Sequence, residues 1–372
     1  MKDFKSGREK WELYLAGDDT GAMVSPLCDD WSLDVPYRWP FDEPEYFPEG
    51  HQRHSLCQQM AMAEVCGYDP LFLSGIDFIC KDLDAVTKTG MEPIEGGKRE
   101  TVTITTPYGD LVKIVDHKRT SEIVRDFIET EEDMKRAVWY TQQCLDYDEN
   151  IAISQGEEAR RAVGDKGMLG TWSGAPAFNM EDQTKMYLHA FDWPDLFEEL
   201  HVVTCDLKQK RHMTFKKAGF DYLFYCVGGT EYSSPDFLLK WVTKQAKTEL
   251  KQWQDEGGFI VWHSCGLIKK LIETGFYDDF MPEILETLSE APFGNLPSLK
   301  WARERIHRDI ITKGNLSLDI ISTGTPEDVR NDVRRIRDET CGYRHIVGLS
   351  DDIMKNTPVA NVLAFVDEAR KE

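Results

Sequence analysis

The sequence lacks the short motifs that identify the commonest metal, nucleotide and hydrolase sites. Its nine cysteines form no C-x-x-C pair, which excludes zinc ribbons and ferredoxin-type iron–sulfur sites. No G-x-G-x-x-G follows a predicted strand, and the chain has no Walker loop, no G-x-S-x-G elbow and no H-E-x-x-H helix. The sequence therefore contains none of these standard sites.

Positive charge is also scarce. The 372 residues include 44 Lys and Arg against 66 Asp and Glu, which gives a formal net charge of −22. Binding to nucleic acid or to an anionic membrane depends on Lys and Arg displacing counterions. The charge balance therefore excludes nucleic acid and the membrane surface as partners.

Long apolar runs are missing as well. No stretch of about 18 apolar residues occurs, and the first ten residues have no apolar segment of the kind found in signal peptides. The nine cysteines are odd in number and scattered, which is typical of free thiols in a reducing compartment. We predict a cytoplasmic protein.

What the sequence does have is an alternation of short apolar strands with capped helices. In the last unit, a strand over 345–349 precedes Thr357-Pro358, where a helix begins with apolar residues at helical spacing. Strands that are apolar on both faces and alternate with helices indicate a parallel sheet covered by helices. Further strands are predicted over 22–25, 71–74, 168–172, 220–227, 259–262 and 309–312, and the segment 283–288 fits a strand or a helix. Eight such units allow a closed barrel or an open sheet, and periodicity alone does not separate the two.

One segment departs from this alternation. Residues 101–105 and 111–115 alternate around Pro107-Tyr108-Gly109-Asp110, which predicts a β-hairpin. We interpret residues 99–116 as an insertion in a single domain that spans 1–372.

Catalytic groups of parallel α/β proteins gather after the carboxyl ends of the strands. His263 and Cys265 follow one such strand two residues apart, so they point the same way and can share a metal ion such as zinc. The alternative is a histidine at a strand end beside a buried cysteine. Asp351, Asp352 and Glu231 are candidates for a third ligand, although acids are also common where helices begin.

Other residues near strand ends are candidates for catalysis or substrate binding. Asp77, Glu231 and Asp351 are the candidate catalytic acids, and Asn315 in Lys313-Gly314-Asn315 offers an amide. Trp172, Tyr225 and Tyr232 could line an aromatic pocket, although aromatic residues in barrel strands more often belong to the core.

The motifs of the C-terminal half resemble those of the uroporphyrinogen decarboxylase superfamily. The resemblance rests on Gly314-Asn315-Leu316, on Gly324-Thr325-Pro326-Glu327-Asp328-Val329, and on the ending Ile353 to Asn361 that contains Thr357-Pro358. Gly174-Ala175-Pro176, residues 218–221 and residues 234–237 extend it in register. It covers most of the chain, is firmest after about residue 165, and implies a (β/α)8 TIM barrel, here with an N-terminal extension.

Departures from the decarboxylase motifs indicate which branch the chain resembles. The arginine-rich motif that follows the first strand in the decarboxylases is replaced by residues 24–31, VSPLCDDW, and Gly75 stands where those enzymes have a catalytic aspartate. The corrinoid-linked methyltransferases instead carry H-x-C at the fifth strand, which His263 and Cys265 match, and a cysteine at the eighth, where this chain has Asp351. The resemblance thus implies a zinc site of His263, Cys265 and Asp351, with a carboxylate in place of a thiolate.

The expected function is methyl transfer from a methoxylated, aromatic compound to the Co(I) of a corrinoid carried by a separate protein, assisted by zinc or an acid. Three alternatives stay open at this point. They are methyl transfer from a methylcorrinoid to a small thiol, decarboxylation of a porphyrinogen, and a barrel without catalytic activity. The sequence leaves the oligomeric state open, a homodimer included.

Overall fold

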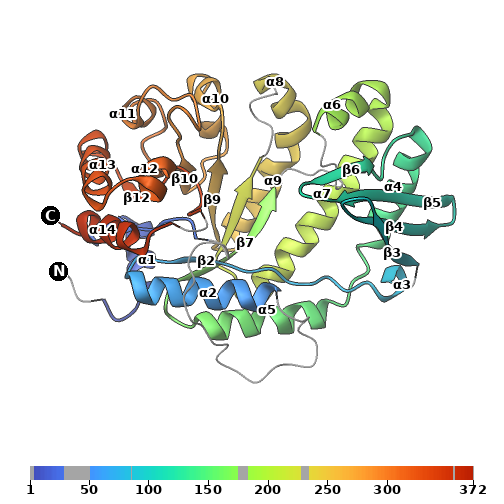
Figure 1. Cartoon of the computed structure of the whole chain (residues 1–372), viewed down its shortest axis with the longest axis horizontal. Coiled ribbons are helices and arrows are strands. Elements are labelled where there is room, and N and C mark those ends of the chain that lie inside the picture. The colour runs from blue at the N-terminus through green and yellow to red at the C-terminus, as the bar shows by residue number, and fades with distance from the viewer. Residues whose placement is uncertain are drawn as a thin grey trace. The chain divides into compact units, whose positions relative to one another are not determined.

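The structure is a computed structural model that describes residues 4–28, 51–84, 86–174, 183–227, 234–354 and 357–371. The chain forms two compact units (Figure 1). The first consists of Met1–Ile76, Ser154–Ala175 and Phe215–Glu372, and the second of Asp77–Ile153 and Pro176–Thr214. The prediction of a single domain stays a prediction.

The first unit contains an eight-stranded parallel sheet. Its strand order is β1-β12-β11-β10-β9-β8-β7-β2, so from β2 to β12 each strand of this unit pairs with the next one along the chain, and β12 pairs with β1. The strands are β1 (Met23–Val24), β2 (Leu71–Leu73), β7 (Met168–Gly174), β8 (Tyr222–Cys226), β9 (Phe259–Ser264), β10 (Ile284–Thr287), β11 (Ile311–Leu316) and β12 (His345–Leu349). This order confirms the predicted TIM-barrel fold and shows that the segment 283–288 contains a strand.

The ends of this sheet approach each other at β1 and β2. No ladder joins these two strands among the described residues, but the amide of Asp69 donates to the carbonyl of Val24 at 2.7 Å. In the reverse direction, the amide of Val24 donates to the Asp69 carboxylate at 2.9 Å. One backbone bond and one side-chain bond thus connect the segment before β2 to β1.

Helices connect the strands, as expected for parallel strands. The helix predicted at Thr357-Pro358 is α14, which begins at Val359 after Pro358 and has no side-chain cap hydrogen bond. Other helices have side-chain caps: Thr325 caps α13 with Asp328 in a reciprocal capping box, and Thr130 caps α4. The helices are α1 (Gly7–Ala16), α2 (His51–Cys66), α3 (Lys81–Asp84), α4 (Glu131–Gln143), α5 (Glu149–Val163), α6 (Gln183–Asp192), α7 (Pro194–Lys217), α8 (Pro235–Phe237) continued by η1 (Leu238–Val242) and α9 (Thr243–Asp255), α10 (Lys269–Glu273), η2 (Tyr277–Asp279), α11 (Leu299–Arg303), α12 (Leu318–Thr323), α13 (Pro326–Glu339) and α14 (Val359–Ala369).

Apolar side chains fill the sheet interior near the amino ends of its strands. One buried cluster joins Val261, Ile284, Ile311 and Ile346, which come from four neighbouring strands, to Trp11 and Tyr14 of α1. Since successive side chains of a strand point to opposite faces, this cluster identifies the inward positions of each strand. The N-terminal extension thus covers this end of the sheet, and the inward positions nearer the carboxyl ends are left for the site.

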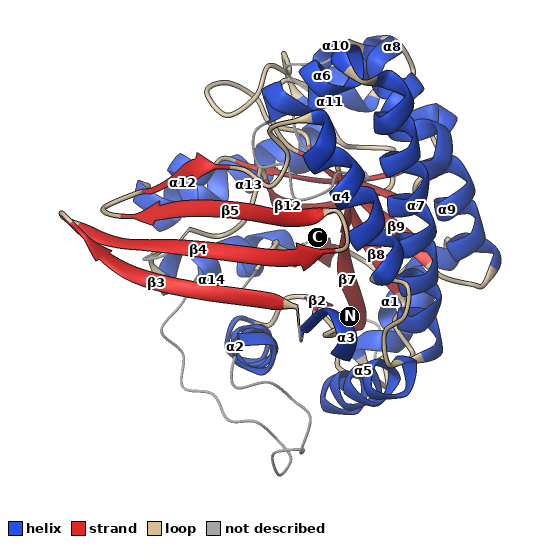
Figure 2. Ribbon diagram, turned by 90° about the vertical axis from the view of Figure 1, so that its right-hand side faces the viewer, coloured by secondary structure: helices blue, strands red, loops and turns tan. Residues whose placement is uncertain are grey.

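The second unit contains a four-stranded antiparallel sheet (Figure 2). Its strands are β3 (Thr87–Ile94), β4 (Gly97–Thr106), β5 (Gly109–His117) and β6 (Ser121–Arg125), in that order. The predicted hairpin is confirmed as β4 and β5, with Thr103 opposite Val112. Because β3 and β6 add a strand on each side, the sheet extends beyond the predicted 99–116.

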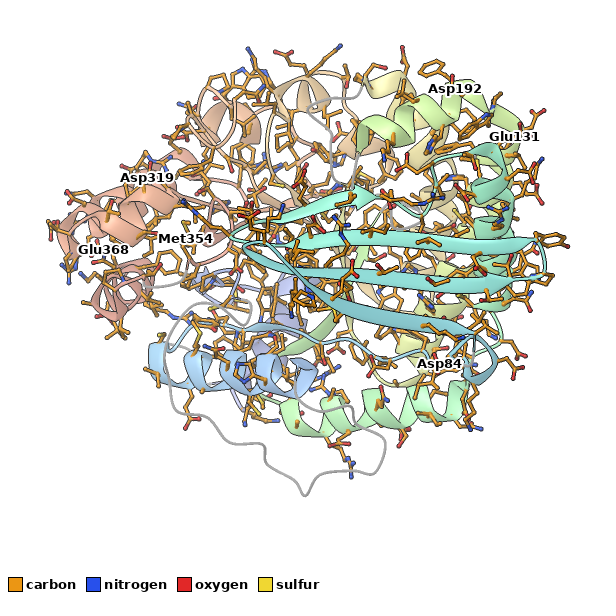
Figure 3. The ribbon with its side chains drawn as sticks, turned by 45° about the vertical axis from the view of Figure 1, so that its right-hand side comes forward. Asp84, Glu131, Asp192, Asp319, Met354 and Glu368 are labelled. Carbon is orange, nitrogen blue, oxygen red and sulfur yellow. The ribbon has the colours of Figure 1, made fainter. Side chains whose placement is uncertain are left out.

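Charged side chains cover the described surface. Acidic residues such as Asp84, Glu131, Asp192 and Asp319 are exposed (Figure 3), in keeping with the charge of −22. Among the described helices, none combines the length and the apolar character needed to cross a bilayer.

Candidate metal centre

His263, Cys265 and Asp351 converge after the carboxyl ends of two strands. His263 is on β9, Cys265 follows that strand directly, and Asp351 lies two residues beyond β12. Each offers one ligand atom, a nitrogen, a sulfur and an oxygen, and these atoms lie within 4.8 Å of one another. Nε2 of His263 is 3.8 Å from Oδ1 of Asp351. The structure therefore brings together the three residues that the sequence predicts as metal ligands.

The other ring nitrogen of His263 contacts a second carboxylate. Nδ1 lies 2.6 Å from Oε1 of Glu286 on β10, and the remaining oxygen of Glu286 accepts from Nζ of Lys313 on β11. All three side chains are buried, with exposed fractions of 7% for His263, 2% for Glu286 and 4% for Lys313. The contact with Glu286 leaves Nε2 as the nitrogen that faces Asp351.

The electrostatics of this cluster favour a cation beside His263. Burial alone would lower the pKa of His263, but hydrogen bonds to Cys265 and Glu286, together with the charges of Glu286 and Asp351, raise that pKa to about 10. Burial would raise the pKa of Glu286, yet the charge of Lys313 and the contact with His263 lower it to about 2. The groups that hold a proton on the imidazole would equally stabilise a divalent ion, whose binding releases that proton.

The donor set fits zinc. Zinc binds histidine nitrogen, cysteine sulfur and carboxylate oxygen, and catalytic sites use three protein ligands and keep one position open. Bond lengths of about 2.0–2.3 Å place the ligand atoms of a tetrahedral site roughly 3.3–3.7 Å apart, close to the separation of Nε2 and Oδ1. A histidine whose second nitrogen meets a carboxylate is also the usual arrangement around bound zinc.

The backbone beside Glu286 is strained. Thr287 and Leu288 directly follow it and have φ values of 79° and 53°, a region that side-chain-bearing residues rarely adopt. Such residues cost about 1–3 kcal/mol each and cluster at functional sites. The hydroxyl of Thr287 donates to the carbonyl of Ser264, which ties this turn to the end of β9.

The ring of Phe224 connects Trp172 to His263 of the candidate centre. Its side chain, at the end of β7, is 47% exposed, and it meets Phe224 edge-on with ring centroids 4.5 Å apart. The ring of Phe224 lies 5.1 Å from that of His263. Trp172 and Phe224 thus form an aromatic surface that reaches the imidazole.

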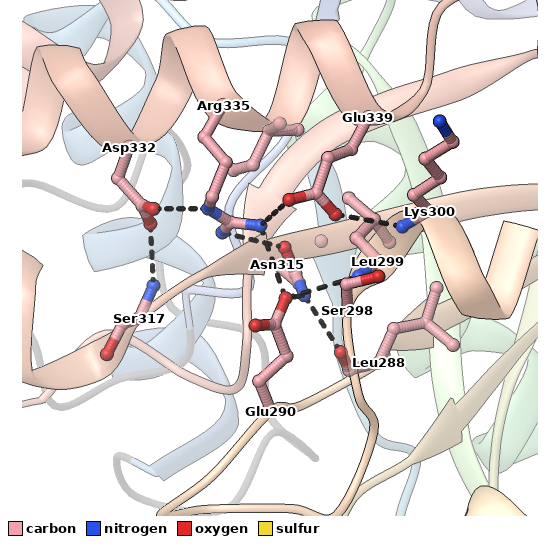
Figure 4. Close-up of polar contacts among 12 residues, drawn as sticks. Leu288, Glu290, Ser298, Leu299, Lys300, Asn315, Ser317, Asp332, Arg335 and Glu339 are labelled. Atoms are coloured by element: carbon pink, nitrogen blue, oxygen red, sulfur yellow. Dashed lines mark hydrogen bonds and ion pairs between the residues drawn. The ribbon is translucent and has the colours of Figure 1, made fainter.

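Two predicted substrate-binding residues, Tyr225 and Asn315, are buried and contact other parts of the protein. Tyr225 is fully buried on the opposite face of β8 from Phe224 and packs edge-on against Trp262 at 4.9 Å. Asn315 is buried, its amide nitrogen donates to the carbonyl of Leu288 and to Glu290, and its oxygen accepts from Arg335 (Figure 4). These contacts explain both residues as parts of the packing around the strands.

The remaining predicted site residues are Asp77, Glu231 and Tyr232. Asp77 begins the second unit, is half-buried, and has its carboxyl pKa raised by burial. Glu231 and Tyr232 lie outside the described residues. Their roles stay predictions.

Three residues of the centre were not predicted from the sequence. Glu286 interrupts the apolar run Ile284-Leu285, and Lys313 precedes the Gly-Asn motif, so each is a charge inside a buried strand. Cys226 pairs in register with His263, and burial together with the charges of Cys265, Glu286 and Asp351 raises the pKa of its thiol to about 12. For Glu286 and Lys313, the sequence signal was a single charged residue within an apolar strand.

Comparisons with known proteins agree with the motifs. Residues 217–372 match the model of the family described as uroporphyrinogen decarboxylase. No curated protein matches the chain.

Two solved structures align with nearly the whole chain at low sequence identity. A methyltransferase from Methanosarcina mazei is similar over 98% of this chain and 98% of its own, with a TM-score of 0.59 and 14% identity. A B12-independent methionine synthase from Shewanella sp. W3-18-1 aligns over 94% of this chain and 97% of its own, with a TM-score of 0.49 and 10% identity. The methyltransferase shows that the fold of the whole chain has a counterpart among solved structures, and residues 217–372 are similar to the uroporphyrinogen decarboxylase family.

Proposed function

We propose that the chain transfers a methyl group from a methoxylated aromatic compound to the Co(I) corrinoid of a separate protein, at a zinc site formed by His263, Cys265 and Asp351. The observation that carries this proposal is the convergence of three different ligand atoms within 4.8 Å at the carboxyl ends of the strands. The likeness in fold to a methyltransferase supports the reaction class. The motifs that resemble the corrinoid-linked branch support the partner.

The carboxylate of Asp351 favours ether cleavage over thiol activation. A zinc ion bound there would supply Lewis acidity toward a departing oxygen. Carboxylate oxygen donates less charge than thiolate sulfur, so a site with one thiolate is a harder acid than a site with two. Asp351 therefore suits a substrate that leaves as an oxyanion.

The aromatic surface suits a ring-bearing methyl donor. Trp172 exposes about half of its side chain and is backed by Phe224, which contacts the ring of His263. An aromatic ring that packs on Trp172 would be held by edge or offset stacking, which contributes about 0.5–1.5 kcal/mol beyond the buried area. Such binding would direct a methoxy group toward the candidate metal centre.

The transfer itself is a displacement at the methyl carbon. The electron pair of Co(I) forms the cobalt–carbon bond, the carbon–oxygen bond breaks, and its electron pair stays on the oxygen, which then takes up a proton. Glu231 and Asp77 stay the candidate acids for that proton, because Asp351 would be ionised as a metal ligand. The corrinoid is carried by the partner, so this chain needs to bind only the methyl donor and the partner.

The cysteines agree with the cytoplasmic location that we propose. All nine lie in the described part of the chain, none of them forms a disulfide there, and six are buried. Free thiols are typical of reducing compartments, and Co(I) also requires reducing conditions.

X-ray absorption at the zinc edge separates this function from methyl transfer to a thiol. We expect the zinc-loaded protein to show one sulfur neighbour and two or three nitrogen or oxygen neighbours, and to show the same sulfur count after a small thiol is added. The reason is that a donor ether requires no sulfur from the substrate. A second sulfur neighbour that appears with the thiol would favour the thiol reaction instead.

A further inference from the structure

The polar residues behind His263 form one level of the sheet interior. Glu286 pairs in register with His263 on one side and with Lys313 on the other, across β9, β10 and β11. Each is two residues beyond an inward member of the apolar cluster, namely Val261, Ile284 and Ile311, so all three point inward. Barrel interiors at such positions are mostly filled by Val, Ile and Leu. A buried His-Glu-Lys row is therefore a departure that packing does not explain.

Glu286 and Lys313 of this row form a buried ion pair. Glu286 is 2% exposed and Lys313 is 4% exposed, and they are in direct contact. A buried ion pair commonly stabilises a fold less than apolar residues of the same volume would. The row thus gains no stability that Ile or Leu could not supply, which indicates a role in the site.

Both oxygens of Glu286 are engaged, and each contact has a different consequence. Oε1 meets Nδ1 of His263 at 2.6 Å and fixes the direction of the imidazole, whereas Oε2 accepts from Lys313. Without Lys313, the buried carboxylate would face His263 with no second partner in this row and would be free to rotate or to take a proton. Either change weakens its hold on the ring.

The neighbouring strand leaves room for the lysine. A Cβ on Gly348 of β12 would lie 3.1 Å from Cγ of Lys313, tighter than nearly all real contacts of this kind. Glycine at 348 therefore allows the long side chain to cross the interior to Glu286. Thr287 and Leu288, which have positive φ values, form the turn that follows Glu286.

We infer that Lys313 is a positioning residue: its ammonium group holds the carboxylate of Glu286 against His263, and so orients the imidazole for the metal, without contacting the metal itself. This inference rests on the zinc site of the proposed function. It extends that site to two residues from two further strands.

Zinc affinity, measured by competition with a chromophoric chelator, tests this inference. We expect Lys313→Met to weaken zinc binding roughly 10- to 100-fold, the usual loss when a partner of a metal-bound histidine is removed. Glu286→Gln should weaken it by a similar factor. Since Lys313 acts through Glu286, the double variant should bind zinc no more weakly than Glu286→Gln alone, whereas losses that multiply would contradict the inference.

Lys10→Met provides a matched control. Lys10 is also a buried lysine in an ion pair, with Asp69 at 2.8 Å, but it belongs to α1 at the amino ends of the strands. Its replacement should lower thermal stability and leave zinc affinity unchanged. If Lys313→Met does not fold, Lys313→Gln keeps a donor for Glu286 and should show an intermediate affinity. Wild-type protein that binds no zinc would overturn the proposed function, while tight binding by both wild type and the Lys313 variants would overturn only the role of Lys313.

Discussion

Replacing His263 with alanine is expected to remove zinc from the protein and to slow methyl transfer by about a thousandfold or more. His263 supplies one of only three predicted ligands, and its ring is held by Glu286 at 2.6 Å in a buried position. A site that retains one thiolate and one carboxylate has fewer than the three protein ligands of catalytic zinc sites, and losing a Lewis acid removes several kcal/mol of transition-state stabilisation. Zinc content by mass spectrometry and the rate of methyl transfer check the two parts of this prediction.

His212→Ala is the control for the loss of a buried imidazole. His212 is 5% exposed on α7 and belongs to the second unit, and it is not one of the three ligands. It should keep zinc and activity even if its thermal stability falls. An unchanged zinc content in His263→Ala would show that zinc binds at another site.

Exchanging Asp351 for cysteine is expected to keep the metal and change the chemistry. The variant has one histidine and two thiolates, a set that zinc accepts readily. Because thiolate donates more charge, we expect ether demethylation to slow by roughly 10- to 100-fold while zinc content stays near one per chain. X-ray absorption should then count two sulfur neighbours in place of one.

Asp352→Cys is the matched variant for this exchange. Asp352 adjoins Asp351, and its amide donates to the Asp351 carboxylate at 2.9 Å. It should add no sulfur to the zinc environment. If Asp352→Cys adds a sulfur and Asp351→Cys does not, the third ligand is Asp352, and the placement of the site is wrong by one residue.

Much of the fold could be predicted because its signals are local. The apolar strand over 345–349 and the helix that begins after Thr357-Pro358 depend on neighbours in the chain, and both elements are confirmed. The segment 283–288 was ambiguous, because six residues with only three apolar side chains fit a strand or a helix, and only the neighbouring strands β9 and β11 decide between them. The strands β3 and β6 are mostly exposed or half-buried and carry weak apolar patterns, so only the central hairpin was predicted.

The site was predictable in part for the same reason. His263 and Cys265 share one strand end, so their spacing is visible in the sequence, whereas Asp351 reaches them only across the sheet and was assigned through the resemblance. Glu286 and Lys313 act through side chains on two further strands, and no local pattern connects them. Tyr225 is buried against Trp262 because its face of β8 is set by register, which the run 220–227 does not reveal, and its role in substrate binding stays a prediction.

The central claim is that a zinc-loaded chain moves a methyl group from a methoxylated aromatic compound to Co(I). The direct measurement mixes the protein, with and without zinc, with cob(I)alamin and a panel of methoxyphenols and methoxybenzoates, and follows the visible spectrum of the corrinoid. We predict that Co(I) converts to methyl-Co(III) with release of an equal amount of the phenol, and that the zinc-free protein is inactive. The claim is contradicted if no member of the panel methylates Co(I) while the same zinc-loaded protein demethylates methylcobalamin when a small thiol is supplied.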